Sequence, residues 1–147
     1  MKYICLVYHE EQKLADMPPA ELAALASECG AWVDELQKDG HHVFSAALQS
    51  IRTATTLRER GGKLSLTDGP FAETKEFLGG FTLLEARDLN EAIQLASRLP
   101  AVRIGSIEMR PVLERDAELT DPLDRKIGAA IRAGQHSLLF PEKGRKE

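Results

Sequence analysis

The sequence predicts an α+β domain built on an antiparallel sheet. Segments of strand length, rich in β-branched and aromatic residues, alternate with two segments of helical periodicity. Their order is β-α-β, then a hairpin around paired glycines, then β-α-β. This is the order of a ferredoxin-like split βαβ unit (βαββαβ) with an extra hairpin, in which both helices cover one face of the sheet.

The first strand is predicted at residues 2–8, KYICLVY, which are nearly all apolar. A strand covered on one face alternates apolar and polar residues, so this strand is expected to be covered on both faces. Residues 9–16 are polar and are expected to connect it to a helix that begins at Pro18-Pro19 and ends at Gly40. The apolar stripe of this helix consists of Leu22, Leu25, Ala26, Cys29, Trp32, Val33 and Leu36.

The remaining elements have local signals. Threonines and leucines alternate on either side of Gly61-Gly62 and predict the hairpin. Asp88 and Glu91 have the spacing of a capping box and predict the start of a second helix, which Pro100 ends. The remaining strands are predicted at 41–48, 53–57, 63–67, 79–86 and 106–113.

Helices on one face of the sheet leave its other face bare. Because residues 2–8 are apolar on both faces, a monomer would expose a large apolar patch, which soluble monomers rarely do. A second copy related by a two-fold axis is the commonest cover for such a face. We therefore expect a homodimer formed through the sheet face.

Composition excludes several classes of protein. The 147 residues carry 19 Lys and Arg against 23 Asp and Glu, a net charge of −4, so a basic nucleic-acid-binding surface is not expected. No apolar run reaches the roughly 18 residues that span a bilayer. The N-terminus lacks the cleavage site of a signal peptide, and two cysteines do not make a disulfide framework. We expect a cytoplasmic protein with no nucleic-acid or membrane partner.

Residues 114–147 are rich in charged residues and are expected to extend a domain formed by residues 1–113. Asp121 and Gly134 have the character of helix ends and predict a helix over about 121–133. The apolar stripe of this helix either packs on the protein's own dimer or docks a different protein. The stripe consists of Leu123, Ile127, Ala130 and Ile131, and the apolar residues Leu138, Leu139 and Phe140 follow it.

The segment 68–81, DGPFAETKEFLGGF, holds the main candidates for a functional site. Asp68 and Glu73 are candidate catalytic bases, because a carboxylate that is partly desolvated can accept a proton. Lys75 and Arg110 are candidate ligand-binding residues. Arg110 lies on the last predicted strand, and its guanidinium fits a carboxylate or another oxyanion.

The same segment also has a purely structural interpretation. Gly69 suits a turn with positive φ, and Phe71 fills either the core or the ligand site. Gly79 and Gly80 stand at the entrance to a strand, where they permit a bulge or a close approach of two backbones. The sequence leaves both interpretations open.

His9 is the third catalytic candidate, because it directly follows the first strand and is expected at the mouth of the same cleft. The adjacent His41 and His42 would point to opposite faces of a strand and make a poor metal pair. Cys5 and Cys29 lie at apolar positions and are expected to act as small hydrophobic residues. The chain has no P-loop, GxGxxG, HExxH or GxSxG motif, and we expect no metal and no cofactor.

Several segments resemble the DGPF branch of the YCII-related family. Segment 68–81 resembles the signature of that branch, and the resemblance extends over about residues 1–113. It is carried further by MKYICLVYHEE at 1–11, TATTLRERGGKLSLTDGPF at 53–71 and SIEMRPV at 106–112. The resemblance implies a dimeric α+β barrel and no particular reaction.

The resemblance also implies two settings for a function. Relatives in the wider family are proposed to use a His-Asp pair, and one is a dehydrochlorinase that acts on a chlorinated hydroxyquinol. The histidine of that pair would fall in the first helix, where this sequence has none, so the same pair is not expected here. The DGPF branch is often encoded beside sigma factors of the extracytoplasmic-function type, which implies regulation.

Two functions from different classes follow from these observations. The first is binding of a small acidic or phenolic molecule in a cleft of the homodimer, with acid–base, lyase-like activity. The alternative is a non-enzymatic accessory or regulatory protein that acts through a protein partner of its C-terminal extension, such as an extracytoplasmic-function sigma factor. The sequence leaves open whether the protein is an enzyme.

Overall fold

The computed structural model describes residues 1–134. Its main sheet has four strands in the order β2-β5-β1-β6, and β3 and β4 form a separate two-stranded sheet. Every strand of the main sheet runs antiparallel to its neighbours. This order confirms the predicted α+β class and its ferredoxin-like arrangement with an extra hairpin. The strands are β1 (Lys2–His9), β2 (His42–Ala47), β3 (Thr55–Arg60), β4 (Lys63–Asp68), β5 (Phe77–Glu85) and β6 (Gly105–Pro111).

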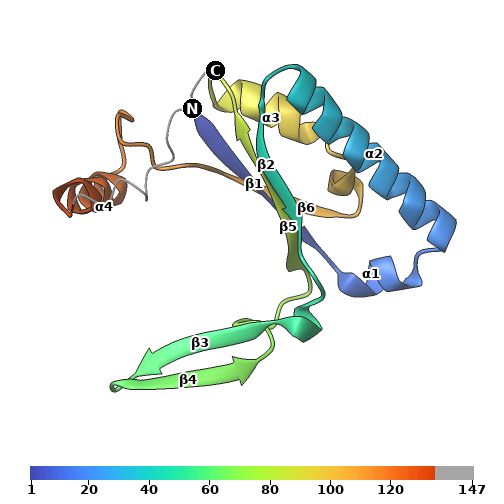
Figure 1. Cartoon of the computed structure of the whole chain (residues 1–147), viewed down its shortest axis with the longest axis horizontal. Coiled ribbons are helices and arrows are strands. Elements are labelled where there is room, and N and C mark those ends of the chain that lie inside the picture. Colours follow the sequence, from blue (N-terminus) through green and yellow to red (C-terminus); the bar gives the residue numbers. More distant parts are fainter. Residues whose placement is uncertain (135–147) are drawn as a thin grey trace.

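The helices α1, α2 and α3 lie on one side of the main sheet, and α4 lies apart from the sheet on the other side (Figure 1). Asp88 caps α3 as predicted, because its carboxylate accepts a hydrogen bond from the backbone N–H of Glu91. Within residues 1–134, none of the helices has the length and apolar character needed to cross a membrane. The helices are α1 (Glu11–Asp16), α2 (Pro19–Lys38), α3 (Leu89–Ser97) and α4 (Pro122–Ala133).

The expectation that residues 9–16 form a polar connector is wrong, because residues 11–16 of this segment form the helix α1. Two side-chain pairs stabilise this short helix. Gln12 Nε2 donates to Asp16 Oδ1 at 2.7 Å, and Lys13 Nζ lies 3.8 Å from Glu10 Oε1. These contacts are local and polar, whereas the helices were predicted from apolar stripes. The sequence of this segment therefore did not indicate a helix.

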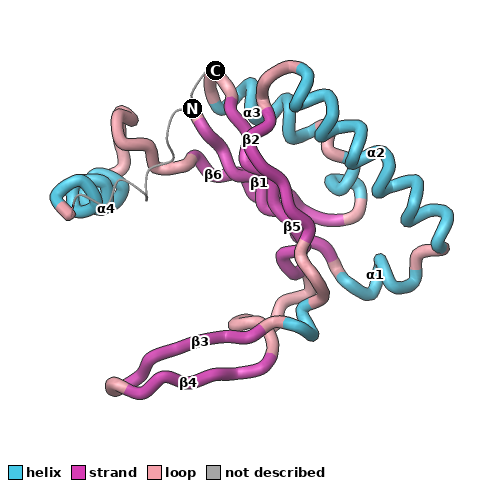
Figure 2. Tube along the Cα trace, in the orientation of Figure 1, coloured by secondary structure: helices cyan, strands magenta, loops and turns pink. Residues whose placement is uncertain are grey.

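The β3–β4 hairpin projects from one end of the main sheet as a separate arm (Figure 2). Its turn falls at Gly61 and Gly62, whose φ angles are +56° and +76°. Positive φ at both central residues is what a tight two-residue hairpin turn requires, so the paired glycines predicted this element for the right reason. The exposed leucines of the arm are Leu57, Leu64 and Leu66.

The hydrophobic core lies between the sheet, the C-terminal half of α2, and α3. Trp32 and Leu36 are the buried residues of α2, and the indole Nε1 of Trp32 donates to the carbonyl oxygen of Leu95 at 2.9 Å. By contrast, Leu22 in the first half of α2 is 38 % exposed. The predicted stripe of α2 is therefore buried only along its C-terminal half. The buried core residues are Tyr3, Cys5, Trp32, Leu36, Leu84, Ala86, Ala92, Leu95, Ala96 and Leu99.

The face of the sheet opposite α2 and α3 is apolar along its centre. Residues that face each other across an antiparallel pair share a face, and Leu6 lies opposite Phe81. The ring of Phe81 lies 5.9 Å from that of Phe44, which is 55 % exposed. Figure 1 shows α2 and α3 only on the other face, so one protomer leaves this surface, here called the open face, without helical cover.

Replacing Gly105 with Ala should destabilise the fold, whereas replacing Gly30 with Ala should stabilise it. A Cβ atom at Gly105 would lie 1.9 Å from the carbonyl oxygen of Tyr8, and strand backbone cannot rotate away. We expect a loss of about 2–3 kcal/mol, the upper range for overpacking. A Cβ atom at Gly30 would meet nothing within 4 Å, and inside a helix Ala is about 1 kcal/mol more favourable than Gly.

Denaturant unfolding of the two variants beside the natural chain measures both effects. Two changes of the same sign would contradict the close approach of β1 and β6 at Gly105.

Candidate functional site

Two pockets lie on opposite faces of the sheet, at the end where β1 finishes and β5 begins. The first has a volume of about 390 Å³, lies between α2 and the sheet, and is called here the helix–sheet pocket. The second has a volume of about 560 Å³, lies between the sheet and the base of the hairpin, and is called the motif cleft. Consecutive residues of β1 line the two pockets, because neighbouring side chains of a strand point to opposite faces: His9 lines the helix–sheet pocket and Tyr8 lines the motif cleft.

His9 lines the helix–sheet pocket with its ring directly over Gly79. A Cβ atom at Gly79 would lie 1.9 Å from His9 Cε1 and 2.6 Å from Nδ1, so no other residue type leaves room for this ring. A Cβ atom at Gly80 would lie 2.8 Å from the carbonyl oxygen of Ala46 on β2. The β1–β5 register shifts at the same point. The bulge and the close backbone approach predicted for Gly79 and Gly80 are both confirmed.

Most of the helix–sheet pocket is apolar, and its second polar feature is a pair of hydroxyl groups. Ser45 Oγ lies 2.8 Å from Thr82 Oγ1, and His42 Nε2 lies 2.9 Å from Ser45 Oγ. Burial raises the pKa of the Cys29 thiol, which also lines the pocket. Burial raises the pKa of Cys5 to about 11. Both cysteines therefore stay protonated near neutral pH, in agreement with the hydrophobic role predicted for them.

Glu11, at the start of α1, fixes the chain that follows His9. Its carboxylate accepts hydrogen bonds from the backbone N–H of Ile51 at 2.6 Å and from Ser50 Oγ at 2.8 Å. The hydrogen bond from Ile51 chiefly holds the pKa of Glu11 below its ordinary value, and the charges of Arg52 and His9 act in the same direction. Glu11 therefore stays ionised and joins α1 to the segment after β2.

The motif cleft is formed by the loop that begins with Asp68. Gly69 has a φ of +100°, as its place in a turn predicted, and its N–H donates to the carbonyl oxygen of Ala54 at 2.8 Å. Thr56 Oγ1 donates to the carbonyl oxygen of Gly69 at 2.8 Å. Phe71 lines the cleft but is 77 % exposed, so it does not fill the core of the protomer.

The charged candidates do not share a pocket. Asp68, Glu73 and Arg110 are exposed, and none of them lines the helix–sheet pocket or the motif cleft. Arg110 pairs with Ile4 on β1, which is roughly 17 Å along the strand from His9.

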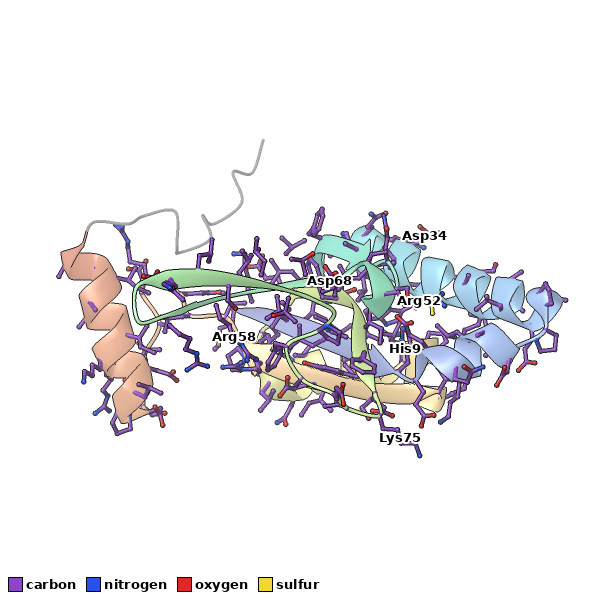
Figure 3. All side chains as sticks on the ribbon, turned by 90° about the horizontal axis from the view of Figure 1, so that it is seen from below. His9, Asp34, Arg52, Arg58, Asp68 and Lys75 are labelled. Carbon is purple, nitrogen blue, oxygen red and sulfur yellow. The ribbon has the colours of Figure 1, made fainter. Side chains whose placement is uncertain are left out.

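Lys75 is also directed away from both pockets. Its side chain is 83 % exposed, projects outward from the molecule (Figure 3), and lies 3.4 Å from the Glu10 carboxylate. Within residues 1–134, no group of three or more His, Cys, Asp or Glu side chains is placed to hold a metal ion.

Two lining residues, Glu76 and Tyr8, are not among the candidate site residues predicted from the sequence. Glu76 lines the motif cleft and accepts a hydrogen bond from Ser106 Oγ at 2.8 Å. Tyr8 lines the same cleft, next along β1 to His9. The position of Tyr8 could have been predicted from the sequence. Tyr8 and His9 end an apolar strand, and two neighbouring side chains of a strand face opposite sides of the sheet.

These features define a ferredoxin-like α+β protein with space for a small molecule on each face of its sheet. The chain belongs to the YCII-related domain family, whose profile matches residues 1–116. An uncharacterized protein of Rhizobium meliloti (strain 1021) is 33 % identical over 114 residues, which is 76 % of this chain and 92 % of that relative. The family predicted from the sequence is thereby confirmed. Helix α4 lies beyond the matched residues.

Replacing Glu11 with Gln should lower the free energy of unfolding at pH 7 and flatten its dependence on pH. The folded-state pKa of Glu11 lies below its ordinary value of 4.5, so its contribution is present above that value and is lost as pH falls through the folded pKa. We expect a loss of about 1 kcal/mol at pH 7, the net size of one typical hydrogen bond.

Urea unfolding at pH 7 and at pH 3 measures this effect, with Glu73→Gln as the control for an exposed carboxylate of the motif loop. If both variants lose the same stability at pH 7, Glu11 does not hold the two segments together.

Proposed function

We propose that the protein binds a small acidic or phenolic molecule in the helix–sheet pocket, where His9 acts as an acid–base group. The observation that carries this proposal is the imidazole of His9 in an otherwise apolar pocket, over a glycine that makes room for it. None of the hydrogen bonds among residues 1–134 involves the His9 side chain, so both ring nitrogens are available to a ligand.

The pocket selects the ligand by its lining. A volume of about 390 Å³ holds a ligand of one or two rings, within the usual range of small-molecule sites. Apolar side chains of α2 and the sheet favour a flat, apolar body. The imidazole accepts a proton from a phenolic hydroxyl or a carboxyl group, and the imidazolium that forms then attracts the phenolate or carboxylate. The Ser45 and Thr82 hydroxyls offer a second polar contact.

The same arrangement supports lyase-like proton transfer. His9 takes a proton from a carbon or hydroxyl of the substrate, and the electron pair of the broken C–H or O–H bond forms a double bond. The leaving group departs with the electron pair of its own bond to the substrate. The imidazolium then returns its proton to solvent or to the departing group. Glu11 acts as a positioning residue, because its bonds to the segment after β2 fix the chain two residues after His9.

A homodimer through the open face is part of this proposal. The face carries apolar residues at its centre, and a second copy of the same sheet would bury them. The helix–sheet pocket lies on the other side of the sheet, so it would stay accessible in such a dimer. The apolar residues of the open face include Ile4, Leu6, Phe44, Ala46, Phe81 and Leu83.

One observation favours the alternative, a non-enzymatic accessory protein that binds a protein partner through its C-terminal extension. In α4, Leu123 and Ile127 are 61 % and 42 % exposed, and the helix lies apart from the main sheet. These residues would pack against the partner, for which an extracytoplasmic-function sigma factor is the candidate that the family resemblance supplies. The apolar residues predicted at 138–140 lie outside the described part of the chain.

Fluorescence of Trp32 should report ligand binding. This residue is the single tryptophan of the chain and lines the helix–sheet pocket, so phenol and benzoate should change its emission in a saturable manner. His9→Asn should weaken binding of both probes about tenfold, equivalent to about 1.4 kcal/mol. His41→Asn, which removes a histidine outside the pocket, should leave binding unchanged.

The same titration separates the two functions. Saturable binding that His9→Asn weakens supports the ligand site. A flat response to both probes, or equal weakening by His41→Asn, would contradict the ligand site and leave the accessory protein as the better proposal.

Leu6→Asp should convert the dimer to a monomer or prevent folding, because it places a charge at the centre of the open face. Leu89→Asp introduces the same charge on α3, on the helical side of the sheet, where the side chain is 48 % exposed, and should leave the dimer intact. Size-exclusion chromatography with light scattering measures both masses. A folded Leu6→Asp protein of dimer mass would show that the open face is not the interface.

A further inference from the structure

The motif cleft contains a carboxylate that has no cationic partner among residues 1–134. Glu76 Oε2 accepts a hydrogen bond from Ser106 Oγ at 2.8 Å, which leaves Oε1 free to accept another. The nearest cations along the sequence do not pair with Glu76. Lys75 lies 3.4 Å from Glu10, and Arg58 Nη2 donates to the carbonyl oxygen of Phe71 at 3.0 Å. Among the residues that the structure describes, Glu76 is the one charged side chain that lines the cleft.

Aromatic side chains line the same cleft as this carboxylate. Tyr8 at the end of β1, Phe77 at the start of β5 and Phe71 in the motif loop all line the cleft. Aromatic rings attract cations to their faces, by about 0.5–2 kcal/mol for each favourable pair. A carboxylate among aromatic rings favours a positively charged ligand and disfavours an anion.

We propose that the motif cleft is a second ligand site, specific for a small organic cation: an amine that carries an apolar or aromatic body. The ammonium group pairs with Glu76 Oε1, and the body lies against Tyr8, Phe71 and Phe77. The cleft volume of about 560 Å³ is in the range of small-molecule sites. This site lies on the opposite face of the sheet from His9, so it does not depend on the proposed acid–base function.

The motif loop is held in the shape that this site needs. Hydrogen bonds from Gly69 N–H to the carbonyl oxygen of Ala54 and from Thr56 Oγ1 to that of Gly69 fix the loop to the hairpin base. Thr74 Oγ1 donates to the carbonyl oxygen of Glu76 at 2.6 Å and fixes the backbone at the carboxylate itself. A site whose walls are set before binding loses less conformational entropy when the ligand enters.

Isothermal titration calorimetry with 2-phenylethylamine tests the proposal, with 2-phenylethanol as the neutral probe of the same shape. We expect the natural protein to bind the amine at least about tenfold more tightly than the alcohol. Glu76→Gln keeps the shape and removes the charge, and should abolish this preference. Glu73→Gln removes a carboxylate of the same loop that does not line the cleft, and should keep it.

Two further variants test whether the amine binds in the motif cleft. Phe71→Ala removes a ring that is 77 % exposed, so the variant should fold, and it should weaken amine binding several-fold. His9→Asn should leave amine binding unchanged, which separates the motif cleft from the helix–sheet pocket. Equal affinity for amine and alcohol, an unchanged preference in folded Glu76→Gln, or equal losses in Glu76→Gln and Glu73→Gln would overturn the proposal.

Discussion

The structure depends on the pairing of β1 with β5 on one side and with β6 on the other. Side chains of β1 alternate between the two faces of the sheet, so Tyr3 and Cys5 enter the core while Leu6 enters the open face. A slip of one residue would exchange the two sets. The same alternation sends Tyr8 into the motif cleft and its neighbour His9 into the helix–sheet pocket.

Glycines on both strands beside β1 make room at the end of β1 that carries Tyr8 and His9. Gly79 of β5 leaves the volume that the His9 ring occupies, and Gly105 of β6 lets that strand approach the backbone at Tyr8. A side chain at either position would push the strands apart or remove the imidazole from the pocket. The Gly79-Gly80 pair of the motif segment therefore has a structural role, and through Gly79 it sets the position of the His9 ring.

The sequence predicted the helices and strands well, but it did not predict which side chains point into a pocket. Periodicity and turn residues suffice for the strands, for α2 and for the hairpin, because their signals are local. The position of Arg110 depends on strand register, which pairs it with Ile4 and not with the end of β1 that carries His9. Closeness in sequence within the motif loop likewise did not show which carboxylate enters the cleft. Glu73 is exposed, whereas Glu76, three residues later, lines the cleft.

The helix–sheet pocket explains why α2 has a longer apolar stripe than its core requires. Trp32 and Leu36 anchor the C-terminal half of the helix, while Leu22 and Leu25 in the other half line the pocket. Apolar surface that is not packed contributes less to stability than the same surface in the core. Proteins retain such surface where a site needs it, at some cost in stability. The first half of the stripe therefore serves as pocket wall, Leu36 serves as core, and Trp32 serves as both. Periodicity alone does not distinguish these roles.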